Sequence, residues 1–104
     1  MLHLFTVADR FQIEGRGCVL VPGLPCEPGD PIVKRGARIR LQTPVGTKFD
    51  TVVKEIEMIS YRKRPEKFAA PILLPHDITK DDVPVGTDVL LTEEKYETFK
   101  KQDG

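Results

Sequence analysis

Short runs of alternating apolar and polar residues, separated by proline and glycine, dominate this chain. Residues 38–42 show the pattern most clearly, because Ile39 and Leu41 alternate with three polar side chains. This is the pattern of a strand with one buried face. The same reasoning predicts strands over 2–8 (extending to 13 if the run continues), 17–21, 71–74 and 88–91, and a brief edge segment at 32–33. The nine prolines and eight glycines lie mostly between these runs and mark turns.

Residues 51–61 fit two patterns. Four apolar residues recur at helical spacing there, and Asp50 is a suitable helix cap. The β-branched side chains favour a strand, with a bulge near Lys54. We predict the strand and keep the helix as the alternative.

Four proline turns connect these elements. Residues 21–24 and 27–30 place proline and then glycine in the type II arrangement, whereas residues 43–46 and 83–86 put glycine last, which suits type I. The words at 44–47 and 84–87 are the same, Pro-Val-Gly-Thr. Four matching residues are too few for a structural repeat, and we interpret them as one turn used twice.

The composition favours an all-β fold, with ten Val, seven Ile and eight Thr against four Ala. A chain of 104 residues has room for one domain. We predict a β-barrel domain over 1–92, because closure removes exposed strand edges. Residues 93–104 form a charged tail that either makes a last helical turn or frays.

Charge and hydropathy exclude several classes of protein. Sixteen Lys and Arg balance sixteen Asp and Glu, which argues against a dedicated nonspecific DNA binder. No apolar run approaches the roughly 20 residues of a membrane helix, and the apolar start is too short for a signal peptide. We therefore expect a cytoplasmic protein in which Cys18 and Cys26 are reduced thiols, and we expect Cys18 to be a small buried side chain in the core. The alternative is a Cys18–Cys26 disulfide across a hairpin.

Catalytic and metal-binding patterns are weak. Ser60 is the only serine and lacks the Gly-x-Ser-x-Gly context. The acidic residues around His76, namely Asp77, Asp81 and Asp82, match no zinc or calcium loop. We expect no catalytic site, no metal and no cofactor.

A basic segment with neighbouring aromatics is the strongest binding signal. Four cations over six residues, flanked by Tyr61 and Phe68, suit a phosphate backbone and a stacked base. The alternative is a solvated loop. Two outward arginines on the 38–42 strand would extend the patch. The candidate RNA-binding residues are thus Arg62, Lys63, Arg64, Lys67, Arg38 and Arg40.

Four segments together resemble the second domain of elongation factor Tu and related translational GTPases. Residues 8–20 contain the apolar-x-Ile-x-Gly-Arg-Gly opening, and residues 27–39 are similar to the family's Gly-x-Ile-Lys-x-Gly-Asp stretch. Residues 51–58 are similar to its strand ending in Val-Glu-Met, and residues 74–90 to its closing segment. The resemblance covers roughly residues 8–91, in the family's order.

This resemblance implies a six-stranded antiparallel Greek-key closed barrel of the translation-factor domain 2 type, with residues 51–61 as a strand. In the family, the rim at this motif helps to hold the aminoacylated tRNA terminus. By matching position, Asp9, Ile13 and Arg16 are the candidate contacts. The alternative for Arg16 is a structural salt bridge with Asp9 or Glu14. Gly15 and Gly17 flank a sharp turn, where Gly17 permits close backbone approach.

The chain lacks the GTPase machinery. It contains no Gly-x4-Gly-Lys-Ser/Thr loop, and no Asn for the guanine-reading Asn-Lys-x-Asp motif. We therefore expect a non-catalytic binding module that recognises RNA (a tRNA end or ribosomal RNA) or a translation-linked protein, such as a GTPase domain in trans. The alternative is a protein–protein adaptor or inhibitor that binds no nucleic acid.

Overall fold

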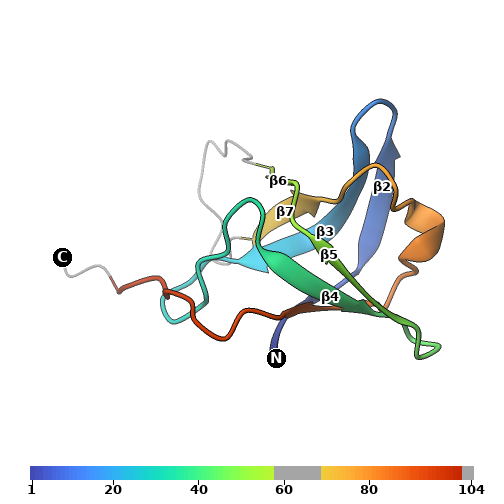
Figure 1. Cartoon of the computed structure of the whole chain (residues 1–104). Helices are drawn as coiled ribbons and strands as arrows, with labels where there is room; N and C mark the ends of the chain where they lie inside the picture. The colour runs from blue at the N-terminus through green and yellow to red at the C-terminus, as the bar shows by residue number, and fades with distance from the viewer. Residues whose placement is uncertain (58–68, 102–104) are drawn as a thin grey trace.

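The computed structural model describes residues 1–57 and 69–101, which fold into two four-stranded antiparallel sheets (Figure 1). The first sheet has the order β1 (Leu2–Thr6), β8 (Asp88–Leu91), β4 (Arg38–Gln42) and β5 (Lys48–Val52). The second has the order β2 (Asp9–Ile13), β3 (Gly17–Pro25), β7 (Ala69–Leu73) and β6 (Glu55–Ile56). A short 3₁₀ turn, η1 (Lys80–Asp82), precedes β8. The prediction of an all-β chain is confirmed.

The prediction of a six-stranded closed barrel is wrong. The described strands form two separate ladders of four instead of one closed ring of six. The physical reason is that two runs expected as single strands each break at a corner and continue in the other sheet. The run 2–13 divides into β1 and β2, and the strand predicted over 51–61 begins in β5 and continues in β6.

At the first corner, consecutive residues change partners. The Val7 N–H donates to the Thr87 carbonyl at 2.8 Å, and the Val7 carbonyl accepts from the Gly86 N–H at 2.8 Å. The next amide, of Ala8, donates to the Val21 carbonyl at 2.9 Å. Both backbone groups of Val7 and the amide of Ala8 are therefore paired, although the chain leaves one sheet for the other.

The second corner lies at Val53 and Lys54. The Val53 amide donates to the Ala37 carbonyl at 3.0 Å, and the Lys54 amide donates to Leu73 in the other sheet at 2.9 Å. The bulge predicted near Lys54 is thus a complete change of sheet, so residues 51–61 are not one continuous strand. Residues 51–57 form no helix, and residues 58–61 lie outside the described part of the chain.

The core fills the space between the two sheets. Ile39 and Leu41 are fully buried, as their alternation predicts, and Cys18 is fully buried with a free thiol, so no Cys18–Cys26 disulfide forms. Other large buried side chains come from both sheets and from the segments between strands: Leu20, Ile72, Leu74, Val53, Val83, Val89 and Leu91. Burial of this apolar surface is the main term that stabilises the fold.

Strand β3 differs from the sequence prediction because it runs through Pro22 and Gly23 instead of ending in a turn. The Val21–Pro22 peptide bond is cis, and the register with β7 shifts between Leu20 and Leu24. Gly23 has φ +104°, and a Cβ there would overlap the Ala70 carbonyl group of β7. The missing side chain lets the two backbones pass at this irregular point.

The C-terminal tail packs along the loop that precedes β4. The Gly29 and Ile32 amides donate to the carbonyls of Phe99 and Glu97, and the Phe99 amide donates back to Asp30 at 2.9 Å. Tail residues up to 101 contain no helical turn. Within the ranges that the structure covers, no helix has the length and apolar character needed to cross a membrane.

Candidate functional site

The three residues carried over from the translation-factor motif lie on or next to β2. Asp9 is exposed, and its carboxylate accepts a hydrogen bond from the Arg10 amide at 2.8 Å. Ile13 is half-buried and pairs with Gly17 across the β2–β3 hairpin. Arg16 lies in the hairpin turn, between two glycines with positive φ. Asp9 and Arg16 are therefore at opposite ends of β2, and no single contact point includes both.

Arg16 makes an ion pair with Glu57, instead of with Asp9 or Glu14 as the sequence suggested. Its Nη2 lies 2.6 Å from Glu57 Oε1, and the Arg16 carbonyl accepts a hydrogen bond from Lys54 Nζ at 3.3 Å. The Arg16 side chain is half-exposed. The guanidinium has five N–H donors, and among the described residues only Glu57 accepts a hydrogen bond from it.

The arginines of β4 lie in the other sheet. Arg40 holds Asp50 on the neighbouring strand with two hydrogen bonds, at 2.6 Å and 3.1 Å. This pairing lowers the pKa of Asp50 and raises that of Arg40, in both cases chiefly through the hydrogen bonds themselves. Arg38 is exposed, and its amide donates to Glu93 Oε1. Arg40 is thus engaged in a cross-strand ion pair, whereas the Arg38 side chain faces solvent.

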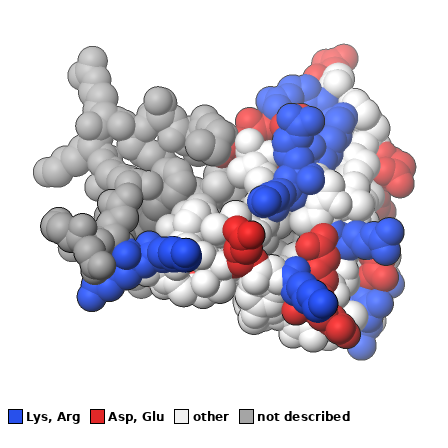
Figure 2. Space-filling model, turned by 60° about the vertical axis from the view of Figure 1, so that its left-hand side comes forward, with Lys and Arg blue, Asp and Glu red and all other residues white. Residues whose placement is uncertain are grey.

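The four predicted loop cations, Arg62, Lys63, Arg64 and Lys67, lie outside the described residues. Elsewhere, basic and acidic side chains are interspersed, and Figure 2 shows blue and red groups alternating over one face, with several blue side chains together at its upper right. The described surface on this face is therefore mixed in charge.

A groove that sequence reasoning missed combines cations with an aromatic ring. We call it the cationic groove. It has a volume of about 360 Å³ between the loop before β4 and the C-terminal tail, and its lining residues are Ile32, Lys34, Arg35, Gly36, Ala37, Glu93, Lys95, Tyr96 and Glu97. Tyr96 is 42% exposed. The groove was not predictable from spacing, because its two walls are about 60 residues apart and come together only through the backbone pairing of the tail.

The cationic groove adjoins the segment that also contacts the hairpin. Arg35 Nη1 lies 3.5 Å from Glu55 Oε1 of β6, and the Gly36 amide donates to the Val53 carbonyl. Lys54, next in the chain, reaches the Arg16 carbonyl. Residues 53–57 therefore connect the groove to the hairpin, because Arg35 of the groove pairs with Glu55 and Arg16 of the hairpin pairs with Glu57.

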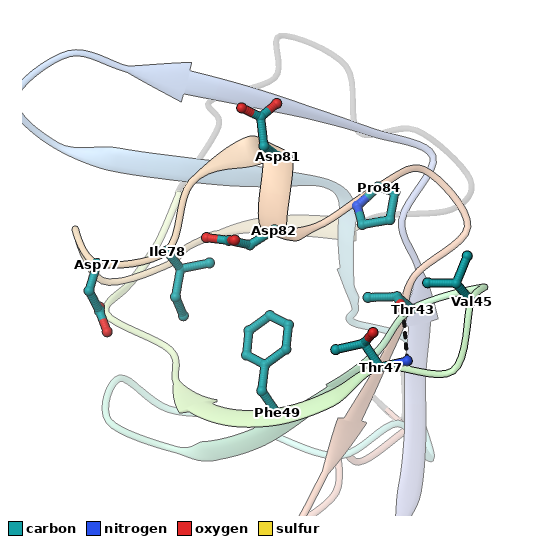
Figure 3. Close-up of a pocket in the computed structure, with 9 residues that line it drawn as sticks. All are labelled: Thr43, Val45, Thr47, Phe49, Asp77, Ile78, Asp81, Asp82 and Pro84. Carbon is teal, nitrogen blue, oxygen red and sulfur yellow. Dashed lines mark hydrogen bonds between the residues drawn. The ribbon is translucent and has the colours of Figure 1, made fainter.

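A second pocket is acidic and apolar, and we call it the acid-rimmed pocket. It has a volume of about 440 Å³ and is lined by Thr43, Val45, Thr47, Phe49, Asp77, Ile78, Asp81, Asp82 and Pro84. Figure 3 shows Phe49 and Ile78 in its interior and Val45 and Pro84 on one side. The acidic residues are spread apart, with Asp77 and Asp82 on the opposite side and Asp81 above them, its carboxylate directed away from the pocket. Asp82 caps η1, since its Oδ2 accepts from the Thr79 amide at 2.9 Å.

The acidic residues do not converge on a point. Among the residues that the structure describes, no three His, Cys, Asp or Glu side chains lie close enough to share a metal ion. His3 Nε2 lies 3.0 Å from Asp88 Oδ1, across the pair formed by edge strand β1 and strand β8. Burial raises the pKa of the Cys18 thiol, which disfavours the reactive thiolate.

Comparison of the chain with models of protein families, with curated proteins and with solved structures gave no match. The geometry of the two pockets and the hairpin is thus the basis for any functional assignment.

Proposed function

We propose that the chain is a non-catalytic, translation-factor-like module that binds RNA. The observation that carries this proposal is the cationic groove, in which Lys34, Arg35 and Lys95 line the same hollow as the exposed ring of Tyr96. Two carboxylates, Glu93 and Glu97, also line it, so cations exceed carboxylates by one. Cations that follow a phosphate backbone, next to an aromatic ring that stacks a base, are the common features of proteins that bind single-stranded nucleic acid.

The neighbouring ion pairs determine how the RNA would bind. Arg35 pairs with Glu55 at 3.5 Å, and Arg16 pairs with Glu57. The arginine side chains are 71% and 49% exposed, and the glutamates are partly exposed, at 39% and 28%. Exposed pairs of this kind contribute at most about 1 kcal/mol each, so a phosphate group can replace the carboxylate at small cost. The sequence segment 58–68, which follows Glu57, adds Arg62, Lys63, Arg64 and Lys67 to the proposed contacts.

Binding to a fluorescent oligouridine decamer and to labelled tRNA, followed by anisotropy, tests the proposal. Three phosphate contacts predict a salt slope near −2, so affinity for the decamer should fall roughly 20-fold between 50 and 200 mM KCl. Tyr96→Ala should weaken binding at least about fivefold, because stacking contributes ~1–3 kcal/mol per base.

Charge-reversal variants locate the contact. Lys34→Glu with Lys95→Glu should abolish the salt-dependent binding, whereas the matched control Lys48→Glu with Lys80→Glu, outside the groove, should leave it within twofold. Arg62→Glu with Lys63→Glu tests the contribution of the basic segment. Absence of any salt-sensitive binding to either RNA refutes the proposal.

A second candidate is a protein–protein adaptor that binds no nucleic acid. The pairing of Arg40 with Asp50 favours it, because this arginine is already neutralised by its neighbour, as does the balance of sixteen basic and sixteen acidic residues. An adaptor with an apolar contact would bind its partner almost independently of salt. We also propose a cytoplasmic location, on the ground that tRNA and ribosomes, the proposed partners, are found there.

A further inference from the structure

The acid-rimmed pocket lies at a different end of the molecule from the β2–β3 hairpin. In Figure 1 the turn after β4 is at the lower right and η1 at the right, whereas the hairpin tip is at the top. The two Pro-Val-Gly-Thr words come together here. A Cβ at Gly86 would lie 3.1 Å from Pro44 Cγ, so the second turn packs against the first.

This end of the molecule exposes apolar side chains that no other described residue covers. Val45 is 87% exposed and Val85 is 52% exposed, each at the tip of its turn. Val45 forms one wall of the pocket, and Phe49 and Ile78 form its centre (Figure 3). A pocket with these walls favours an apolar group, because that group would leave water on binding.

The charge at the margin is of one sign. Of the described residues that line the pocket, three are carboxylates and none is a lysine or an arginine. Arg10 and Lys80 lie on the β2 side of η1, where the Arg10 Nε–H donates to the Lys80 carbonyl, and neither lines the pocket. Asp77 and Asp81 make no side-chain hydrogen bond or ion pair within the described part of the chain.

We propose that the acid-rimmed pocket docks a short basic segment of a partner protein, with an apolar side chain against Val45 and Phe49. Separate lysine or arginine side chains of that segment would reach Asp77 and Asp81, which lie at different parts of the margin. Charge complementarity selects this occupant. A nucleic acid would meet three carboxylates, and an uncharged apolar peptide would leave them unpaired. The long apolar stem of lysine or arginine, with the charge at its tip, matches an apolar floor beneath an acidic margin.

The test uses a labelled peptide with two lysines and two leucines, and a matched peptide with glutamates in place of the lysines. Titration of the ¹⁵N-labelled protein should move the backbone amide signals of Val45, Gly46 and Asp81 with the basic peptide and not with the acidic one. Asp77→Asn with Asp81→Asn should weaken the affinity about fivefold or more. Val45→Ser should also weaken it, and its near-complete exposure means that this change does not disturb the core.

The matched control, Glu14→Gln with Glu94→Gln, removes the same charge elsewhere and should leave the affinity within twofold. Equal binding of both peptides, equal loss in the control, or signals that move at Tyr96 instead of Val45 would each overturn the proposal. Movement of the Val45 and Asp81 signals by the oligouridine decamer would also overturn it, since this face would then bind RNA. RNA binding at the cationic groove is measured in a separate experiment, so a failure of peptide docking can be distinguished from a failure of RNA binding.

Discussion

Replacement of Gly17 by alanine tests how closely the two backbones of the second sheet approach. Gly17 has φ +134°, and a Cβ there would lie 2.6 Å from the Leu74 carbonyl oxygen. Both the glycine and Leu74 are buried, and the Leu74 amide donates to the Cys18 carbonyl at 2.9 Å. The backbone oxygen therefore cannot move without breaking the β3 contact beside it.

Two costs add for Gly17→Ala. The positive φ costs about 1–2 kcal/mol for an L-residue, and relief of the overlap with the carbonyl costs a further ~1–3 kcal/mol. We expect the free energy of unfolding to fall by about 3 kcal/mol, a large share of the roughly 5–15 kcal/mol that stabilises a domain. Gly15 is the matched control, because it has φ +79° in the same hairpin and nothing within 4 Å of its would-be Cβ. Gly15→Ala should therefore cost only about 1 kcal/mol.

Urea denaturation followed by circular dichroism measures both variants. With an m-value of about 1–3 kcal/mol/M for a small protein, the midpoint of Gly17→Ala should fall about 1–2 M below that of Gly15→Ala. Equal midpoints for the two variants would refute the reasoning, because they would show that the Leu74 carbonyl does not restrict this position.

Three further predictions concern particular side chains. Thr87 is fully buried and its hydroxyl donates to the Pro84 carbonyl at 2.6 Å, so Thr87→Val should lower the free energy of unfolding by about 1 kcal/mol, whereas Thr47→Val in the matching exposed turn should change it by less than about 0.5 kcal/mol. The hydrogen bond from Thr6, and then the one from His3, lower the pKa of Asp88. The ionised carboxylate therefore stabilises the fold above its unfolded-state pKa, and this contribution disappears as the pH falls through the folded-state pKa. Asp88→Asn should reduce the loss of stability at acid pH in urea midpoints measured against pH, and an unchanged loss would contradict this. Burial raises the pKa of Cys18, so in a Cys26→Ser background iodoacetamide at pH 8 should modify the native protein far more slowly than the protein in urea, and similar rates would show that the thiol is accessible.

The alternation of apolar and polar residues was sufficient to predict the clearly amphipathic strands. Ile39 and Leu41 are buried as expected, and the strands at 38–42 and 88–91 have the predicted bounds. The start of β5 was missed, because Lys48 and Asp50 are polar. The cross-strand pair of Arg40 with Asp50 explains why charged residues occur in this strand.

The corners were not predictable from the pattern. Nothing in the run from Leu2 to Ile13 or around Lys54 marks where a strand changes sheets, since the backbone amides at Ala8 and Lys54 find new partners far away in the sequence. The same limit applies to the repeated turns. Gly46 closes the first turn through a hydrogen bond to Thr43, whereas the second closes between Thr87 and Pro84, so identical residues adopt different hydrogen bonds in different surroundings.

The candidate site was only partly visible in the sequence. The exposure of Arg16 in a glycine-flanked turn followed from the motif, but its partner Glu57 did not, because it comes from an element 41 residues away. Tyr96 gave no signal at all, as a single aromatic residue in a charged tail. It gained a candidate role only when backbone pairing placed the tail beside Lys34 and Arg35.

The two corners have a mechanical consequence. The chain passes from one sheet to the other at Val7–Ala8 and again at Val53–Lys54. Neither sheet can therefore separate from the other or shift against it without breaking backbone hydrogen bonds at these two corners. The molecule should accordingly lose all its structure in one step, and the slowest hydrogen–deuterium exchange should be shared by amides of β3 and β4 rather than confined to either layer.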